Sequence, residues 1–165
     1  MNDFTRILTE IQTSEAEIAA DVAIEQASKQ AQRTEVIRYA RSRFNEAGVG
    51  SYLQEQAGAM AAAHYWVKVY DNDLSDRVQT SIEFVPAPHE LYEKGIGGPN
   101  TVTLHIVTWS DAAVKAEIYT GHSNNRQMLP ATTIAELSLD HVRQWFQRFV
   151  EFAMNYQKER DARHR

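Results

Sequence analysis

The chain has 165 residues, of which 43% are hydrophobic and 24% are charged, and it contains no cysteine. This length and composition are typical of one globular domain with a sizeable core, and they exclude a largely disordered chain. The lack of cysteine excludes disulfides, thiolate zinc sites, iron–sulfur ligands and cysteine nucleophiles, and the formal net charge of −5 disfavours a surface that binds nucleic acid generally.

The first 47 residues contain neither glycine nor proline, and their charge reverses along the chain. Residues 1–25 hold six acids and one base, whereas residues 26–43 hold five bases and one acid. The pattern predicts one long helix that ends before Gly48. Because the acidic half comes first, the order of charges also suits the helix dipole without any partner.

Apolar residues recur along this helix at the spacing of a coiled-coil seam. Seven of them form the expected self-association surface: Phe4, Leu8, Ile11, Ile18, Val22, Ile37 and Phe44. Glu15 interrupts the alternating spacing of four and three residues. Ser14 and Glu17 form a capping-box pattern, so a break near Thr13 is the alternative to a continuous helix.

The remaining chain is expected to contain a short helix, two hairpins, a fifth strand and a final helix. The expected bounds are a helix over 51–63, strands over 64–70, 77–85, 101–108, 112–120 and 132–137, and a last helix that begins at Ser138 or Asp140. The last helix carries the widest apolar and aromatic stripe of the chain. We therefore expect it to be buried against the sheet.

These elements define the fold class as α+β. The expected architecture has a long N-terminal helix, a short second helix, an antiparallel sheet of four to five strands and a C-terminal amphipathic helix packed on the sheet. We expect a single domain over residues 1–165. In it, residues 1–48 protrude from or wrap around an α+β body formed by residues 49–165.

The second hairpin allows a prediction of register. A three-residue loop at 109–111 pairs Thr108 with Ala112 and places two apolar sets on one face, whereas a two-residue loop separates them. Burial therefore favours the three-residue loop. The two sets are Val102, Leu104 and Ile106 with Val114, Ala116 and Ile118, and the other face carries His105, Lys115, Glu117 and Tyr119.

No segment has the pattern of a catalytic or metal site. The six histidines share no ligand spacing, and there is no serine nucleophile elbow. The acidic loop 71–76 lacks the glycine and the twelfth-position ligand of a calcium loop. The glycine-rich segment 95–100 precedes a strand rather than a helix, unlike a phosphate loop. We expect no catalytic residues, no cofactor, no metal and no enzymatic activity.

Two segments carry candidate contact residues. The basic half of the first helix is suited to a protein partner or to phosphate, through Lys29, Arg33, Arg38, Tyr39 and Arg41. The connection 86–100 is the longest irregular segment, and such loops are often functional. Its candidate contact residues are His89, Glu90 and Tyr92.

The best interpretation is a non-enzymatic protein–protein interaction module that forms a homodimer through its first helix. It would act as a small regulator, inhibitor or immunity-type protein by occupying the surface of an unidentified protein partner. An antiparallel dimer is expected to bring acids of one copy near bases of the other, namely Glu10, Glu15 and Glu17 near Arg33, Arg38 and Arg41.

Two alternatives stay open. The first is a small-ligand-binding or enzymatic module with a pocket between the sheet and the C-terminal helix. The second is a nucleic-acid-binding regulator that uses the basic half of the first helix, which the net charge disfavours. Residues 1–25 lack the features of a signal peptide, and no apolar run approaches the roughly 20 residues of a membrane span. We therefore expect a cytoplasmic protein with no membrane partner.

Overall fold

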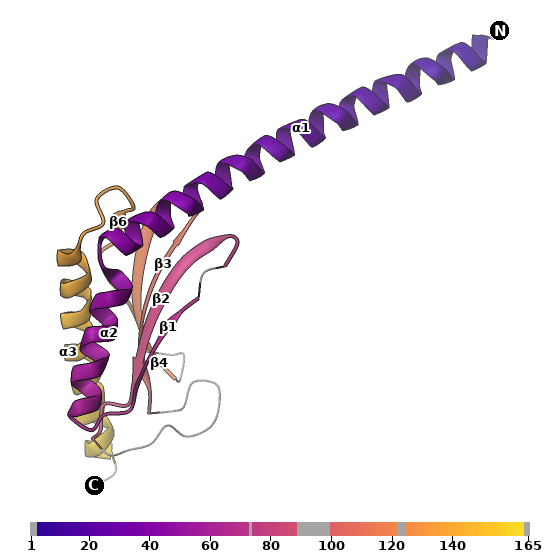
Figure 1. The fold of residues 1–165 in the computed structure, drawn as a ribbon. Coiled ribbons are helices and arrows are strands. Elements are labelled where there is room, and N and C mark those ends of the chain that lie inside the picture. Colours follow the sequence, from indigo (N-terminus) through magenta and orange to yellow (C-terminus); the bar gives the residue numbers. More distant parts are fainter. Residues whose placement is uncertain (1–2, 73, 89–99, 122–124, 164–165) are drawn as a thin grey trace.

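A computed structural model describes residues 3–72, 74–88, 100–121 and 125–163. Its elements are α1 (Asp3–Glu46), α2 (Val49–Ala62), β1 (Val67–Asp71), β2 (Arg77–Phe84), β3 (Val102–Trp109), β4 (Ala113–Thr120), β5 (Arg126–Met128), β6 (Thr132–Thr133) and α3 (Leu139–Arg163). Helices α2 and α3 cover one face of the sheet, and α1 projects far from the body (Figure 1). The predicted α+β class is therefore confirmed.

Helix α1 is uninterrupted over 44 residues, which corresponds to about 66 Å. The alternative break near Thr13 does not occur. The hydroxyl groups of Thr9 and Thr13 instead donate to the carbonyl oxygens of Thr5 and Thr9, each at 2.8 Å, within a continuous helix. The helix ends where predicted, because Gly48 adopts a φ of 70°, the left-handed conformation that favours glycine.

The sheet is antiparallel and has the strand order β1-β2-β3-β4-β5, with β6 pairing with the same edge of β4 as β5. Strand β5 was not predicted, since three exposed residues give no period-2 pattern. The strand predicted over 132–137 pairs only at Thr132–Thr133. The backbone after Thr133 instead leads toward the start of α3, near the base of α1.

The predicted register of the second hairpin is wrong by two residues. Thr108 pairs with Val114 rather than with Ala112. Ala112 adopts a φ of 60°, and its N–H donates to the carbonyl oxygen of Trp109 at 3.2 Å, so the three residues that connect the strands are 110–112 rather than 109–111. Because the shift is even, the predicted faces are preserved. All six apolar residues of the two predicted sets are fully buried.

The core lies between this apolar face of the sheet and the helices α2 and α3. Phe149 of α3 is fully buried, and its ring centroid is 5.2 Å from that of Phe84 in β2. Trp145 donates its indole N–H to the carbonyl oxygen of Pro130 at 3.0 Å, which satisfies its polar atom. The predicted burial of the last helix against the sheet is confirmed, and α3 begins directly after Ser138.

Candidate functional site

The main candidate surface is the part of α1 that projects beyond the body. Every residue from 3 to 35 is exposed, and we call this segment the arm. It is about 50 Å long. Figure 1 shows that it leaves the body as a straight rod. Within the described part of the chain, the arm therefore gains little stabilisation from tertiary packing.

Five of the seven residues predicted for self-association form an apolar stripe along the arm. They are between 44% and 68% exposed, and we call them the arm stripe: Phe4, Leu8, Ile11, Ile18 and Val22. At 3.6 residues per turn, they lie within an arc of about 80°. Glu15 lies inside this arc. Exposed apolar patches are often found at interaction sites, so the arm stripe is a candidate for one.

The other two predicted residues, Ile37 and Phe44, are each only 4% exposed and belong to the core of the body. With Ala40, they form the side of α1 that packs on the body. On a straight helix this side is a continuation of the arm stripe. The body therefore covers the stripe side of α1 from Ile37 onward. Of the seven predicted residues, the five of the arm stripe are left exposed.

Arg43 fixes the base of the arm to the body. Its guanidinium donates to three backbone carbonyl oxygens, those of Ile134 at 3.4 Å, Ala135 at 3.3 Å and Leu137 at 3.0 Å. It also pairs with Glu46 at 2.6 Å. Hydrogen bonds from Arg43 and then Ser42 hold the pKa of Glu46 below its ordinary value. This anchor was not predictable from local sequence, because residues 134–137 were expected in a strand.

The predicted basic contact residues do not form one face. Lys29 pairs with Glu25 and Arg38 pairs with Glu35, each at 2.6 Å along the helix. Lys29 and Arg33 lie in line with the arm stripe. Arg38 and Arg41 lie about 100° or more around the helix from the centre of the arm stripe. Tyr39, which is half exposed, also lies off the stripe.

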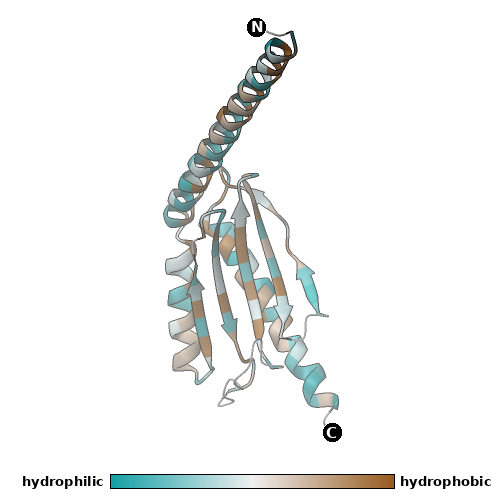
Figure 2. Ribbon diagram, turned by 90° about the vertical axis from the view of Figure 1, so that its right-hand side faces the viewer, coloured by the Kyte–Doolittle hydropathy of each residue, from teal (hydrophilic) through white to brown (hydrophobic). Residues whose placement is uncertain are grey.

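The sheet face opposite the helices is turned toward the viewer in Figure 2, and its side chains form a polar network. His105 Nδ1 lies 3.3 Å from Glu117 Oε1, and the other Glu117 oxygen lies 3.5 Å from Arg126 Nη1. Burial raises the pKa of Tyr119 on the same face. The side chains of this network therefore contact one another. In the described part of the chain, no three His, Asp or Glu side chains are grouped to hold a metal ion.

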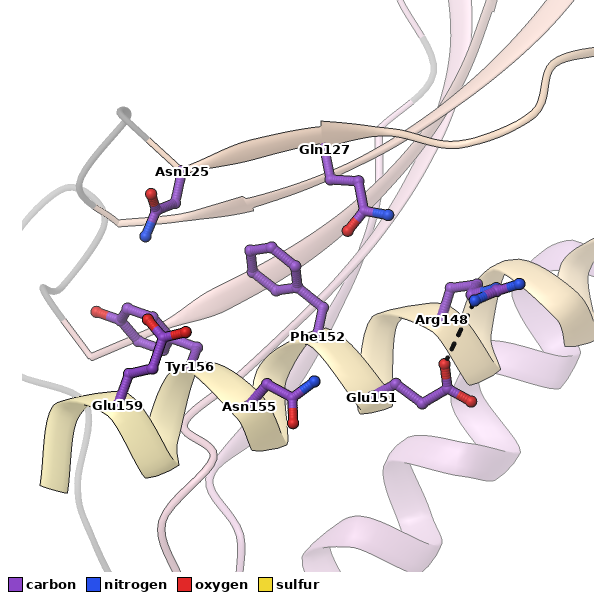
Figure 3. Close-up of a pocket in the computed structure, with 8 residues that line it drawn as sticks. All are labelled: Asn125, Gln127, Arg148, Glu151, Phe152, Asn155, Tyr156 and Glu159. Atoms are coloured by element: carbon purple, nitrogen blue, oxygen red, sulfur yellow. Dashed lines mark ion pairs between the residues drawn. The ribbon is translucent and has the colours of Figure 1, made fainter. Parts of the chain in front are cut away.

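A pocket of about 380 Å³ lies between β5 and α3. Phe152 points from α3 toward the strand, between the amides Asn125 and Gln127, and Arg148 pairs with Glu151 at 3.8 Å (Figure 3). This pocket opens at the edge of the sheet. The interface beneath the C-terminal helix, where the ligand-binding alternative placed its pocket, is packed with buried core side chains.

The predicted loop contacts His89, Glu90 and Tyr92 lie outside the described residues. The chain matches no known family model, and no curated protein or solved structure is significantly similar to it. Among the described residues, no helix combines the length and apolar character needed to cross a membrane. The molecule is thus defined as an α+β protein with a projecting helical arm.

Proposed function

We propose that this protein is a non-enzymatic protein–protein interaction module that self-associates through α1. It acts as a small regulator or inhibitor by occupying the surface of a partner protein. The observation that carries the proposal is the arm stripe, whose five apolar side chains are all exposed on the part of α1 that projects from the body.

An isolated helix gains most of its stability from packing of its apolar face. A second copy of the chain carries an identical stripe, so every molecule of the protein can serve as a partner for another. Complete burial of an aliphatic or aromatic side chain stabilises by about 1.5–3 kcal/mol, so the half still exposed contributes roughly 1 kcal/mol per residue. Ten such side chains in a dimer give roughly 10 kcal/mol, which is comparable to the cost of association. Because the gain and the cost are of similar size, the net free energy is small, and we expect a reversible dimer that dissociates on dilution.

The surface offered to a different protein is the off-stripe side at the base of the arm. Arg38, Tyr39 and Arg41 are exposed there, and they point away from the stripe. They therefore remain accessible when the stripe is paired. Tyrosine and arginine are also the residue types that contribute most binding energy at protein interfaces.

Light scattering of the full chain at micromolar concentration tests self-association. The expected mass is about twice 18.8 kDa, decreasing toward 18.8 kDa on dilution. A monomer mass at every accessible concentration would refute it.

The partner-binding part has its own test. A protein captured from the native host by the full chain should be lost when Tyr39→Ala is used as bait. If the same protein is captured equally well by the Tyr39→Ala variant, the base of the arm is not the contact surface. For the nucleic-acid alternative, DNA binding that weakens steeply with salt is the required result.

A further inference from the structure

We infer that the two copies pair antiparallel over the arms alone, with Phe4 of one copy facing Val22 of the other and Leu8 facing Ile18. This inference rests on the proposed self-association and specifies its geometry. It yields an elongated dimer in which the two bodies lie at opposite ends of a helix pair.

The spacing of the arm stripe supports this register. Phe4, Ile11 and Ile18 occupy one of the two core positions of the heptad, and Leu8 and Val22 occupy the other. In an antiparallel pair, residues at one core position face residues at the other. The register that joins Phe4 to Val22 satisfies this rule for every stripe residue. Only Ile11 then faces a polar residue, Glu15.

Glu15 also selects the orientation. A parallel, aligned dimer would stack Glu15 of both copies in one layer, and two like charges would face each other in the seam. In the antiparallel register, the two Glu15 residues are four positions apart, about 6 Å along the helix. Each carboxylate can then turn to its own side of the pair and remain hydrated.

The body limits the overlap. A fuller antiparallel overlap would bring Glu15 near Arg33 of the second copy, which would pair opposite charges. The same overlap would also bring Phe4 opposite Phe44. Phe44 is buried, and the body already occupies that side of α1. Between Val22 and the body, the stripe side carries Lys29 and Arg33, which suits a segment left in solvent.

The register fixes the dimensions of the dimer. Its two-fold axis passes near Thr13, and Ile37, where the body begins, is about 36 Å further along the helix. The two bodies are therefore about 70 Å apart. Each presents its own copy of Arg38, Tyr39 and Arg41, so the dimer is bivalent toward a partner protein.

Electron–electron double resonance between spin labels tests this geometry in the full chain. The chain has no native cysteine, so Thr13→Cys and Ala27→Cys each give one label per copy. Both residues are exposed and lie on the side of α1 away from the stripe. We expect label separations of about 20 Å at residue 13 and about 45 Å at residue 27.

Each competing arrangement gives a different pair of distances. A parallel dimer gives about 20 Å at both sites, and a full antiparallel overlap gives about 40 Å at residue 13 and about 20 Å at residue 27. Either result overturns this inference and leaves self-association intact. Absence of dipolar coupling together with a monomer mass overturns the proposed self-association itself.

Discussion

Replacing Ile18 with alanine should weaken the dimer without weakening the arm. The side chain of Ile18 is 61% exposed in the single chain and is expected to face Leu8 of the second copy. Burial of a whole isoleucine contributes about 1.5–3 kcal/mol, so the part still exposed is worth about 1 kcal/mol in each copy. Two copies lose about 2 kcal/mol, and the dissociation constant should rise about thirtyfold. Alanine is the stronger helix former, so loss of helix cannot produce this effect.

Ile24→Ala is a matched control on the same helix. Ile24 is 68% exposed and carries the same side chain, but it lies about 160° around the helix from the centre of the arm stripe. Its replacement makes the same change in composition and helix propensity. The dissociation constant of this variant should therefore stay close to that of the natural chain.

Sedimentation equilibrium over a hundredfold range of protein concentration gives the dissociation constants of all three proteins. A large increase for Ile18→Ala alone supports the arm stripe as the interface. Equal increases for both variants would show that exposed apolar area, rather than the stripe, drives association. An unchanged constant for Ile18→Ala would refute the assignment of Ile18 to the seam.

Three further predictions concern stability. Arg43→Met removes the charged donor of three carbonyl groups and should lower the free energy of unfolding in urea by roughly 1.5–3 kcal/mol. Arg38→Met, which removes only an exposed ion pair, should cost less than about 0.5 kcal/mol, and equal costs would refute the anchor. Phe149→Ala should cost about 3–5 kcal/mol in the same assay, because the side chain is fully buried. Burial raises the pKa of Tyr119 above 10.0, so its neutral form stabilises the fold below pH 10, and this contribution is lost as the pH rises above that value. The stability of the natural chain relative to Tyr119→Phe should therefore decrease between pH 8 and pH 11, and a constant difference would contradict the assignment.

The helices and the buried face of the sheet were predictable because their signals are local and periodic. The lack of glycine and proline before Gly48 defined α1, and alternation around Leu104 and Ile118 defined the buried face. The hairpin register failed because Ala112 adopts a left-handed conformation, which the residue type does not indicate. The face assignment survived that error because an even shift preserves which side chains point inward.

The candidate surface was predictable only in part. The heptad spacing identified the arm stripe, but it treated Ile37 and Phe44 as part of the same surface, because spacing along one helix cannot show where a body packs on it. The role of Arg43 depends on carbonyl groups more than 90 residues away in the chain, as the separation from Ile134 is 91 residues. Such contacts leave no mark in local sequence.

Because α1 is attached to the body at one end only, the stability of the helix decreases from that end toward the N-terminus. The buried turns from Ile37 to Phe44 already serve as the nucleus, so the costly first step of helix formation is complete before the arm begins. The arm then lengthens residue by residue toward Phe4, and it frays from that end. Amide hydrogen exchange should accelerate steadily from residue 35 to residue 3 in dilute protein. As the protein concentration increases, amide exchange should become slower in the outer part of the arm, because association stabilises the helix there.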